Sequence, residues 1–397
     1  MSPPRFVLVV IVAFIPKVKK PWHAHPNLLC SAPMPPRKHE PVYYADYLGL
    51  DSLLGAQRPK SAVSGKAAHD EMLFIVVHQV YELWFKQILH ELGSVLADFA
   101  GPVVDERAVG VAVARLGRVG EIQKILIAQL SVLETMTPLD FLDFRDYLTP
   151  ASGFQSFQFR LIEDALGLAQ ARRVRLDETP YYSRLSKEHQ DLIKAGHERP
   201  SLFSLVEAWL ERTPFVGLGD FDFWKAYAGA VDAMLSGDEA IIRENPTLGE
   251  AEREQELQEL GKTRESFDSL LDARKFETLR TEGVWRMSQK ALLAALFVHL
   301  YRDQPILHLP FRLLEALVEI DENFSIWRYR HAIMVHRMIG TKIGTGGSSG
   351  HQYLKRTAET HRVFMDFFQL STFLIPRSAR PELPREVERA LGFVHGG

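Results

Sequence analysis

The sequence of 397 residues predicts an all-α protein, a large helical domain that carries a projecting, charged helical segment. No stretch alternates apolar and polar residues for long enough to require a sheet. No internal repeat of about 20 to 50 residues is visible either. Instead, apolar side chains recur at helical spacing, most clearly around His78 and His331.

The same periodicity and the end signals of helices place the elements in order along the chain. The body of the fold is expected over residues 68–382, followed by a C-terminal tail over 383–397. Residues from about 238 to 282 are dense in Glu and Arg, which is typical of a solvated helix or helical hairpin that projects from the body. The expected helices lie near residues 68–99, 106–135, 138–148, 154–167, 186–195, 201–211, 219–235, 249–278, 284–302, 310–319, 322–340 and 351–370.

His78 lies at the centre of an apolar face on the first long helix. At about 100° per residue, several apolar side chains fall within about 60° of it, whereas Gln79 and Lys86 fall on the flank. His78 is therefore predicted to point inward. It is either a core histidine satisfied by a carbonyl or a residue that meets a ligand.

His331 has a similar setting on a later helix, where Trp327, Met334 and Met338 lie on its side. His336 is rotated away by roughly 100° or more and is the weaker candidate ligand. An imidazole on an apolar face can bind a metal ion, but a buried core histidine gives the same pattern.

A shorter helix is expected to begin at Thr137, whose hydroxyl caps it, with Pro138 at the first helical position. Its three aspartates share one face, while Phe141, Phe144 and Arg145 share the opposite face. A guanidinium on an aromatic face needs an anionic partner, because an unpaired buried charge is costly. A distant Asp or Glu, or an anionic ligand, could be that partner.

Residues 344–350 read Gly-Thr-Gly-Gly-Ser-Ser-Gly, a flexible loop rich in hydrogen-bond donors. The loop matches neither of the common phosphate-binding glycine motifs, and it follows a helix where those motifs follow a strand. A loop that closes over a ligand is therefore favoured over a phosphate cradle.

Composition excludes several kinds of site. The single cysteine, Cys30, excludes an internal disulfide framework, a cysteine-rich zinc site, an iron–sulfur cluster and the usual covalent attachment of haem. No histidine has a Glu three residues before it and no His-Glu-x-x-His motif occurs, which disfavours a di-iron oxygenase and a zinc hydrolase. The net charge of -3 suggests neither a nucleic acid nor an anionic membrane as partner.

The N-terminal segment resembles a signal peptide in one respect only. Residues 6–15 are apolar, but a membrane-spanning helix needs about 20 such residues, and lysines follow where a cleavage region would carry small residues. Residues 1–33 are expected to be a disordered or over-extended N-terminus that precedes a plausible start at Met34. Residues 34–67 are expected to form an N-terminal arm, and the protein is expected to be cytoplasmic.

Six motifs occur in a fixed order along the chain, and together they closely resemble the tryptophan 2,3-dioxygenase family over about residues 43 to 381. The motifs are FIVVHQVYELWFK (74–86), SVLETMTP (131–138), FRD (144–146), SGFQS (152–156), WRYRH (327–331) and GTGGSSG (344–350).

The resemblance implies an all-helical enzyme with one non-covalent haem b in each subunit. His331 would be the axial ligand of the haem iron, and Ser152 would contact the pocket or a haem propionate. With O2 as co-substrate, such an enzyme cleaves the indole C2–C3 bond of L-tryptophan to give N-formyl-L-kynurenine, the first step of tryptophan catabolism by the kynurenine route.

The resemblance also assigns substrate contacts. His78 would accept a hydrogen bond from the indole N–H, and Phe74 would form an apolar wall. Arg145 would hold the α-carboxylate, with Thr345 at the amino-acid end of the substrate. Phe141 occupies a pocket position at which some members of the family carry Tyr.

The arm carries the last of the implied contacts. In the family it crosses into a neighbouring subunit, so Tyr44, Tyr47 and Leu48 would line the partner's indole pocket in a homotetramer with shared active sites. Two other functions fit parts of the pattern. One is a haem-dependent monooxygenase that acts on an indole or tryptophan derivative on the same scaffold. The other is a haem sensor without turnover, which would not require the substrate contacts.

Overall fold

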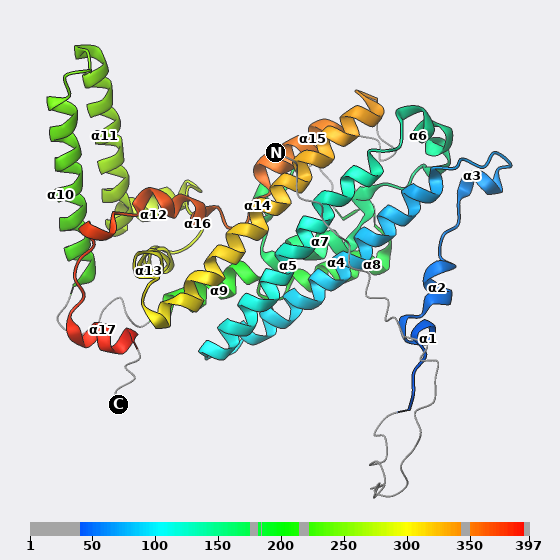
Figure 1. The fold of residues 1–397 in the computed structure, drawn as a ribbon, viewed down its shortest axis with the longest axis horizontal. Helices are drawn as coiled ribbons and strands as arrows, with labels where there is room; N and C mark the ends of the chain where they lie inside the picture. Colours follow the sequence, from blue (N-terminus) through cyan, green and yellow to red (C-terminus); the bar gives the residue numbers. More distant parts are fainter. Residues whose placement is uncertain (1–39, 175–181, 184, 214–221, 343–349, 393–397) are drawn as a thin grey trace, which may run out of the picture. The chain divides into compact units, whose positions relative to one another are not determined.

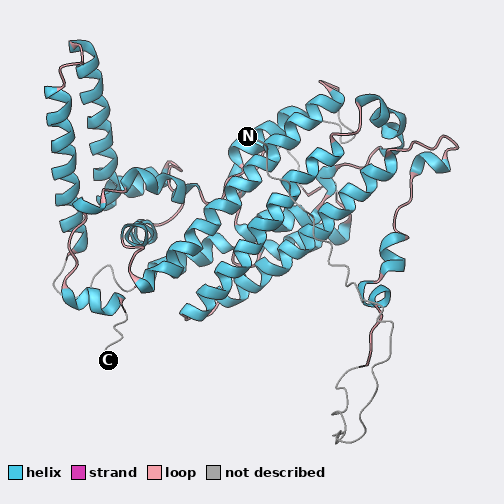
Figure 2. Ribbon diagram, in the orientation of Figure 1, coloured by secondary structure: helices cyan, strands magenta, loops and turns pink. Residues whose placement is uncertain are grey.

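The computed structural model describes residues 40–174, 182–183, 185–213, 222–342 and 350–392. Every element in these ranges is an α-helix or a 3-10 helix, and none is a strand (Figure 2). The all-α prediction is therefore confirmed. The chain divides into two units, Met1–Ala56 and Gln57–Gly397.

The smaller unit contains two helices of five residues each, α1 (Tyr44–Leu48) and α2 (Leu50–Leu54). Gly49 joins them with a φ of 60°, a left-handed conformation that glycine adopts without steric cost. Neither helix buries any of its own residues. In the described part of this unit, the large apolar side chains are therefore exposed, apart from the half-buried Leu50.

Three long helices form the centre of the larger unit: α4 (Glu71–Phe99), α5 (Glu106–Leu133) and α14 (Pro305–Ile339) (Figure 1). Helix α5 packs against both of the others. Tyr81 of α4 donates to the Leu126 carbonyl of α5 at 2.7 Å, and Gln123 of α5 donates to the Ile320 carbonyl of α14 at 3.0 Å. These buried bonds fix the three helices side by side.

The sequence predicted two helices here, over 310–319 and 322–340. The structure instead has one helix of 35 residues, α14. The predicted break fell at residues 320–321. Asp321 is 2% exposed and accepts the backbone N–H groups of Val363 and Phe364, each at 2.9 Å. The carboxylate thus joins α14 to a distant segment, which a local pattern cannot reveal.

The single helix predicted over 351–370 is wrong, because the same segment divides it into two helices. Helix α15 (Gly350–Thr360) packs on α14 and ends before the residues that Asp321 binds, and α16 (Met365–Gln369) is a separate short helix. Helix α7 (Phe157–Leu166) packs on α4. Together α4, α7, α14 and α15 provide most of the walls of the cavity described below.

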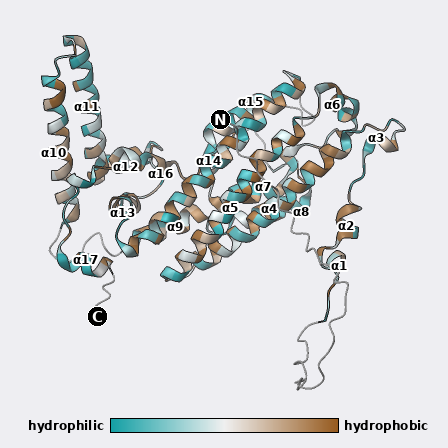
Figure 3. Cartoon of the chain, in the orientation of Figure 1, coloured by the Kyte–Doolittle hydropathy of each residue, from teal (hydrophilic) through white to brown (hydrophobic). Residues whose placement is uncertain are grey.

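Helices α10 (Phe223–Glu244) and α11 (Glu250–Leu271) pack as an antiparallel pair (Figure 1). The acidic segment at about residues 238–282 includes only the end of α10, together with α11 and the short helix after it, and its projection from the body stays a prediction. Hydrophilic residues are spread along α10 and α11 (Figure 3), and only Phe267 and Leu270 of α11 are buried. The helix predicted over 249–278 is interrupted, because Asp272 accepts two backbone N–H groups and caps α12 (Ala273–Thr281).

Among the described residues, no single helix is long and apolar enough to cross a membrane. Only α5 together with the bent segment that follows it, Pro138–Leu148, reaches the required length and apolar composition. The other elements are α3 (Lys60–Val63), α6 (Pro138–Arg145), η1 (Asp146–Leu148), η2 (Gly153–Gln155), η3 (Gln170–Arg172), α8 (Lys187–His197), α9 (Leu202–Glu211), α13 (Gln289–Leu300), η5 (Leu370–Phe373), η6 (Arg377–Ala379) and α17 (Arg385–Leu391).

Candidate functional site

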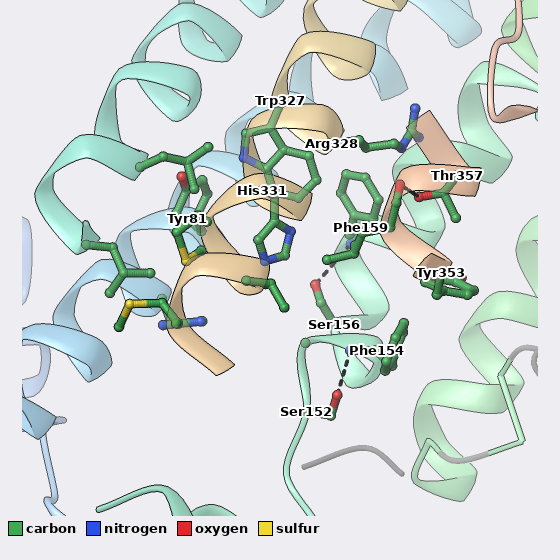
Figure 4. Close-up of a pocket in the computed structure, with 18 of the residues that line it drawn as sticks. Tyr81, Ser152, Phe154, Ser156, Phe159, Trp327, Arg328, His331, Tyr353 and Thr357 are labelled. Carbon is green, nitrogen blue, oxygen red and sulfur yellow. Dashed lines mark hydrogen bonds between the residues drawn. The ribbon is translucent and has the colours of Figure 1, made fainter. Parts of the chain in front are cut away.

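A cavity in the larger unit brings together most of the residues that the sequence singled out. Its walls come mainly from α4, α6, α7, α14 and α15, and aromatic and aliphatic side chains make up most of them (Figure 4). The predicted residues that line it are Phe74, His78, Phe141, Arg145, Ser152 and His331.

Four predicted residues are not placed in this cavity by the structure. Thr345 lies outside the described residues. Tyr44, Tyr47 and Leu48 belong to the smaller unit, where 75%, 78% and 43% of their surfaces are exposed. Their contact with a neighbouring subunit's pocket stays a prediction.

His78 of α4 lies on the cavity wall with an accessible side chain. Its Nδ1 is 2.7 Å from the Phe74 carbonyl oxygen, so this nitrogen carries the proton and Nε2 is the acceptor of the neutral ring. The surrounding protein lowers the pKa of His78 by desolvation, which favours the neutral form. The side chain therefore faces the cavity with a hydrogen-bond acceptor.

His331 of α14 lines the same cavity, next to Trp327 at a ring-centroid separation of 5.4 Å. Burial lowers the pKa of His331 to about 4, with a smaller contribution from the charge of His78. Its Nδ1 is buried and has no hydrogen-bond partner among the described residues. A neutral imidazole is the form that binds a metal ion.

The aromatic wall near His78 is made by α4 and α6. The Phe74 ring lies 4.0 Å from the His78 ring and 5.8 Å from Phe141, measured between centroids. Phe144 is fully buried 5.5 Å from Phe74, and Arg145 extends the wall as a half-buried cation. These contacts form an aromatic wall of tilted and edge-on rings, and the Arg145 guanidinium lines the same cavity.

The geometry of α6 agrees with its predicted start and faces. Thr137 caps the helix and exchanges hydrogen bonds with Asp140, and Pro138 stands at the first position. Asp143 and Asp146 are exposed, whereas Phe144 is buried. The capped start thereby fixes which residues of this short helix turn to the cavity.

Ser152 lines the cavity and also shapes its own turn. Its Oγ accepts the Phe154 N–H at 3.4 Å (Figure 4). Its own N–H donates to the Gln155 side chain at 3.4 Å. Ser152 therefore caps η2 with its hydroxyl and also borders the cavity.

A buried ionic cluster at the cavity wall was missed by sequence reasoning. Glu163 of α7 accepts hydrogen bonds from three arginines, at 3.0 Å from Arg160, 2.8 Å from Arg173 and 3.0 Å from Arg328. Burial alone would raise the pKa of Glu163, but Arg173, Arg160 and the other partners hold it well below its usual value. The carboxylate is therefore ionised and holds the three guanidinium groups together.

His361 completes this Glu163 cluster. Its Nε2 accepts the Val174 N–H at 3.0 Å, so its Nδ1 carries the proton and donates to Glu163 at 3.0 Å. Burial lowers the pKa of His361, which keeps the ring neutral. The local signals for the cluster were Arg328 within the WRYRH motif and the Arg160–Glu163 pair, three residues apart on α7. Arg328 and His361 lie 165 and 198 residues from Glu163, so the sequence could not join them to this pair.

Comparison with known proteins agrees with the motifs. The family model for tryptophan 2,3-dioxygenase matches residues 32–374, which begins and ends somewhat earlier than the motifs indicated. A tryptophan 2,3-dioxygenase of Alteromonas mediterranea is 52% identical over 354 residues, which are 89% of this chain and 98% of the relative. One of Bdellovibrio bacteriovorus is 53% identical over 356 residues, 90% of this chain and 99% of the relative.

An animal relative matches over a similar span. The tryptophan 2,3-dioxygenase of Xenopus laevis is 47% identical over 352 residues, 88% of this chain and 86% of the relative. With the family model and the two bacterial relatives, this match confirms the predicted resemblance. The chain belongs to the tryptophan 2,3-dioxygenase family.

Proposed function

We propose that this protein is a haem-dependent dioxygenase that cleaves the indole C2–C3 bond of L-tryptophan with O2 and forms N-formyl-L-kynurenine. The observation that carries the proposal is one cavity, in a chain of this family, that contains His331, His78 and Arg145. The three side chains provide a metal ligand, a hydrogen-bond acceptor and a carboxylate-binding cation.

His331 would hold a haem b by binding its iron through the imidazole, one haem per subunit. The fit rests on a neutral imidazole with a buried, unpartnered Nδ1 among the described residues, and on walls that are mostly apolar and aromatic. Bound haem supplies the redox chemistry that activates O2. Ser152 lies on the same lining and would contact the haem edge or the pocket.

His78 would orient the substrate by accepting a hydrogen bond from the indole N–H. Its Nε2 is the acceptor because the Phe74 carbonyl holds the proton on Nδ1. Phe74 and Phe141 would form the walls against the indole ring. This role depends on position more than on basicity, because the ring stays neutral.

Arg145 would hold the α-carboxylate of tryptophan. A guanidinium at the end of an aromatic wall matches a substrate with an indole at one end and a carboxylate at the other. Thr345 is proposed to assist at the same end of the substrate, where it would meet the ammonium and carboxylate groups.

Product analysis tests the proposed function. The protein is reduced without oxygen and then given L-tryptophan and O2, and the product is identified by absorbance and mass. N-formylkynurenine, which contains both oxygen atoms of O2, would support the dioxygenase. A product with one added oxygen atom would favour the monooxygenase, and binding without product would favour the sensor.

We expect His78→Ser to lower turnover but leave measurable product, because orienting a donor assists the reaction without breaking a bond. Methylation of the indole nitrogen should slow the wild type more than the variant, since serine leaves room for the methyl group. Steady-state rates on both substrates measure this difference. No turnover in the variant, with tryptophan still bound, would instead indicate obligatory base catalysis.

The exposed helices α1 and α2 support a role for the arm in assembly. Tyr44 and Tyr47 are three-quarters exposed, and neither helix buries a residue of its own. Large apolar side chains exposed together often mark an interaction surface. We propose that Tyr44, Tyr47 and Leu48 complete the pocket of a neighbouring subunit in a homotetramer.

Two truncations test the arm. Removing residues 1–33 should leave activity and assembly unchanged, whereas removing residues 1–51 should weaken tryptophan binding and loosen the oligomer. Light scattering and activity assays report both effects. A fully active monomer that lacks residues 1–51 would contradict the shared site.

The cytoplasmic location also stays a prediction, which fractionation of cells would check.

A further inference from the structure

Arg330 of the WRYRH motif has no role in the proposed function. It precedes His331 on α14, but it is not one of the described residues that line the cavity. Successive residues of a helix lie about 100° apart, so Arg330 turns toward α5. Its guanidinium donates to the Ile127 carbonyl at 3.1 Å, to Ser131 Oγ at 3.2 Å and to Glu134 at 3.4 Å. Arg330 thus joins the His331 turn of α14 to the last turns of α5.

The end of α5 that Arg330 binds belongs to a second motif of the family. Ser131 and Glu134 lie in SVLETMTP, so Arg330 connects two motifs across 199 and 196 residues of sequence. The same end of α5, with the turn that follows it, lines the cavity through Leu130, Leu133 and Met136. The contact therefore links the proposed haem ligand's helix to one wall of the cavity.

Other hydrogen bonds tie this end of α5 to α4. Tyr81 donates to the Leu126 carbonyl at 2.7 Å, and Gln129 donates to the Val77 carbonyl at 3.0 Å, next to His78. Helix α6, which carries the proposed carboxylate-binding arginine, follows α5 after a short turn and packs on α14. The end of α5 is therefore a junction of the helices that carry the proposed substrate contacts, and Arg330 fixes it to α14.

A second ionic pair joins the same two helices at a distance from the cavity. Lys124 of α5 lies 2.9 Å from Glu319 of α14. Glu319 precedes Arg330 by three helical turns, about 16 Å along the axis, and neither Lys124 nor Glu319 lines the cavity. Both ionic pairs are partly exposed, so each contributes little to the free energy of unfolding. Comparison of the two pairs separates general packing of α5 on α14 from placement of the α5 end at the cavity.

We propose that Arg330 is a positioning residue that sets the register between the end of α5 and the His331 turn of α14. This inference rests on the proposed dioxygenase function. Arg330 touches neither the substrate nor the haem. It acts through α5 and the adjoining α6, and so places Arg145 relative to His331. Such placement matters because a shift of about 1 Å can lower a rate about 100-fold, even when the altered residue lies far from the reacting atoms.

Arg330→Gln and Lys124→Gln test this proposal as a matched pair, because each removes one cation between α5 and α14. We expect Arg330→Gln to weaken tryptophan binding by about 2- to 30-fold, the range for residues that act on a site without contacting its ligand. Lys124→Gln should keep the wild-type affinity, and both should keep the wild-type haem content. Binding is measured without O2, from the change in the Soret band during titration, so this readout does not depend on turnover.

Tryptamine, which lacks the carboxylate, reports on the placement of Arg145. Arg330→Gln should lower kcat/KM for tryptophan more than kcat/KM for tryptamine. Arg330→Lys should be intermediate, because one ammonium group keeps the charge but cannot reproduce the planar guanidinium's contacts. Glu134→Gln tests the link from α5 should Arg330→Gln be unfolded by circular dichroism. The effects of Arg330→Gln and Glu134→Gln should not add in the double variant, since both remove the same contact.

The contrary results are distinct. Wild-type tryptophan affinity in Arg330→Gln, an equal loss in Lys124→Gln, or equal losses on tryptophan and tryptamine would overturn the positioning role and leave the dioxygenase function intact. Loss of haem from a folded Arg330→Gln would also overturn it, because Arg330 would then support the haem ligand itself. Failure of the wild type to bind haem or to convert tryptophan would overturn the proposed function, and this inference with it.

Discussion

Replacement of His331 by alanine is expected to leave a folded protein that does not retain haem. A non-covalent haem with one axial protein ligand depends on that bond as well as on burial. Loss of a group that merely supports a metal ligand lowers affinity by roughly 10- to 100-fold, and loss of the ligand itself should exceed this. Haem per chain in the purified variant, from its pyridine haemochrome spectrum, measures the effect.

His336→Ala is the matched control for this experiment. His336 lies on the same helix, is exposed, and contacts the His351 ring at a centroid separation of 4.4 Å. Its removal should leave haem content unchanged. Because His331 Nδ1 has no hydrogen-bond partner among the described residues, His331→Ala breaks no such bond there. Wild-type haem content and an unchanged ferrous spectrum in His331→Ala would exclude His331 as the ligand.

The placement of the two histidines could be predicted from the sequence because it depends on helix periodicity. Residues three, four and seven apart share a face whatever the rest of the chain does. His331 therefore lies with Trp327 on the cavity side of α14, and His78 lies with Phe74 on the cavity side of α4. The face of α6 on which Arg145 lies could be predicted in the same way, from the capped start of that helix.

The ionic cluster could not be predicted in this way, since it depends on contacts between distant residues. Glu163 and His361 are 198 residues apart, and Glu163 and Arg328 are 165 residues apart. The same applies to the continuity of α14, where Asp321 reaches Val363 across 42 residues. A local pattern shows a charged residue, but whether its partner is water or a distant backbone group depends on tertiary packing.

The family resemblance provided what neither periodicity nor packing gives. The cavity shows that Phe74, His78, Arg145 and His331 lie together, but an aromatic cavity with two imidazoles fits several ligands. The roles of these residues are carried over from the family and stand as proposals. Variants that separate haem binding from substrate binding are therefore the informative ones.

Arg145→Ala should make that separation, because we expect a severe loss of tryptophan turnover with normal haem content. Removal of one partner from a buried, charged hydrogen-bonded pair typically costs about 2 to 5 kcal/mol, or roughly 30- to 5,000-fold in kcat/KM. Haem content should not change, since Arg145 lies on α6, whereas His331, the proposed haem ligand, lies on α14. Steady-state kinetics and haem per chain are measured on the same preparation.

Tryptamine shows whether the lost interaction is the one with the carboxylate. It keeps the indole and the amine but has no carboxylate, so its kcat/KM should be nearly the same in the wild type and in Arg145→Ala. Arg145→Lys should be intermediate for tryptophan, because lysine keeps the charge but cannot bind a carboxylate through two parallel hydrogen bonds. If the alanine variant loses efficiency equally on tryptophan and tryptamine, Arg145 supports the structure of the cavity and does not bind the substrate's carboxylate.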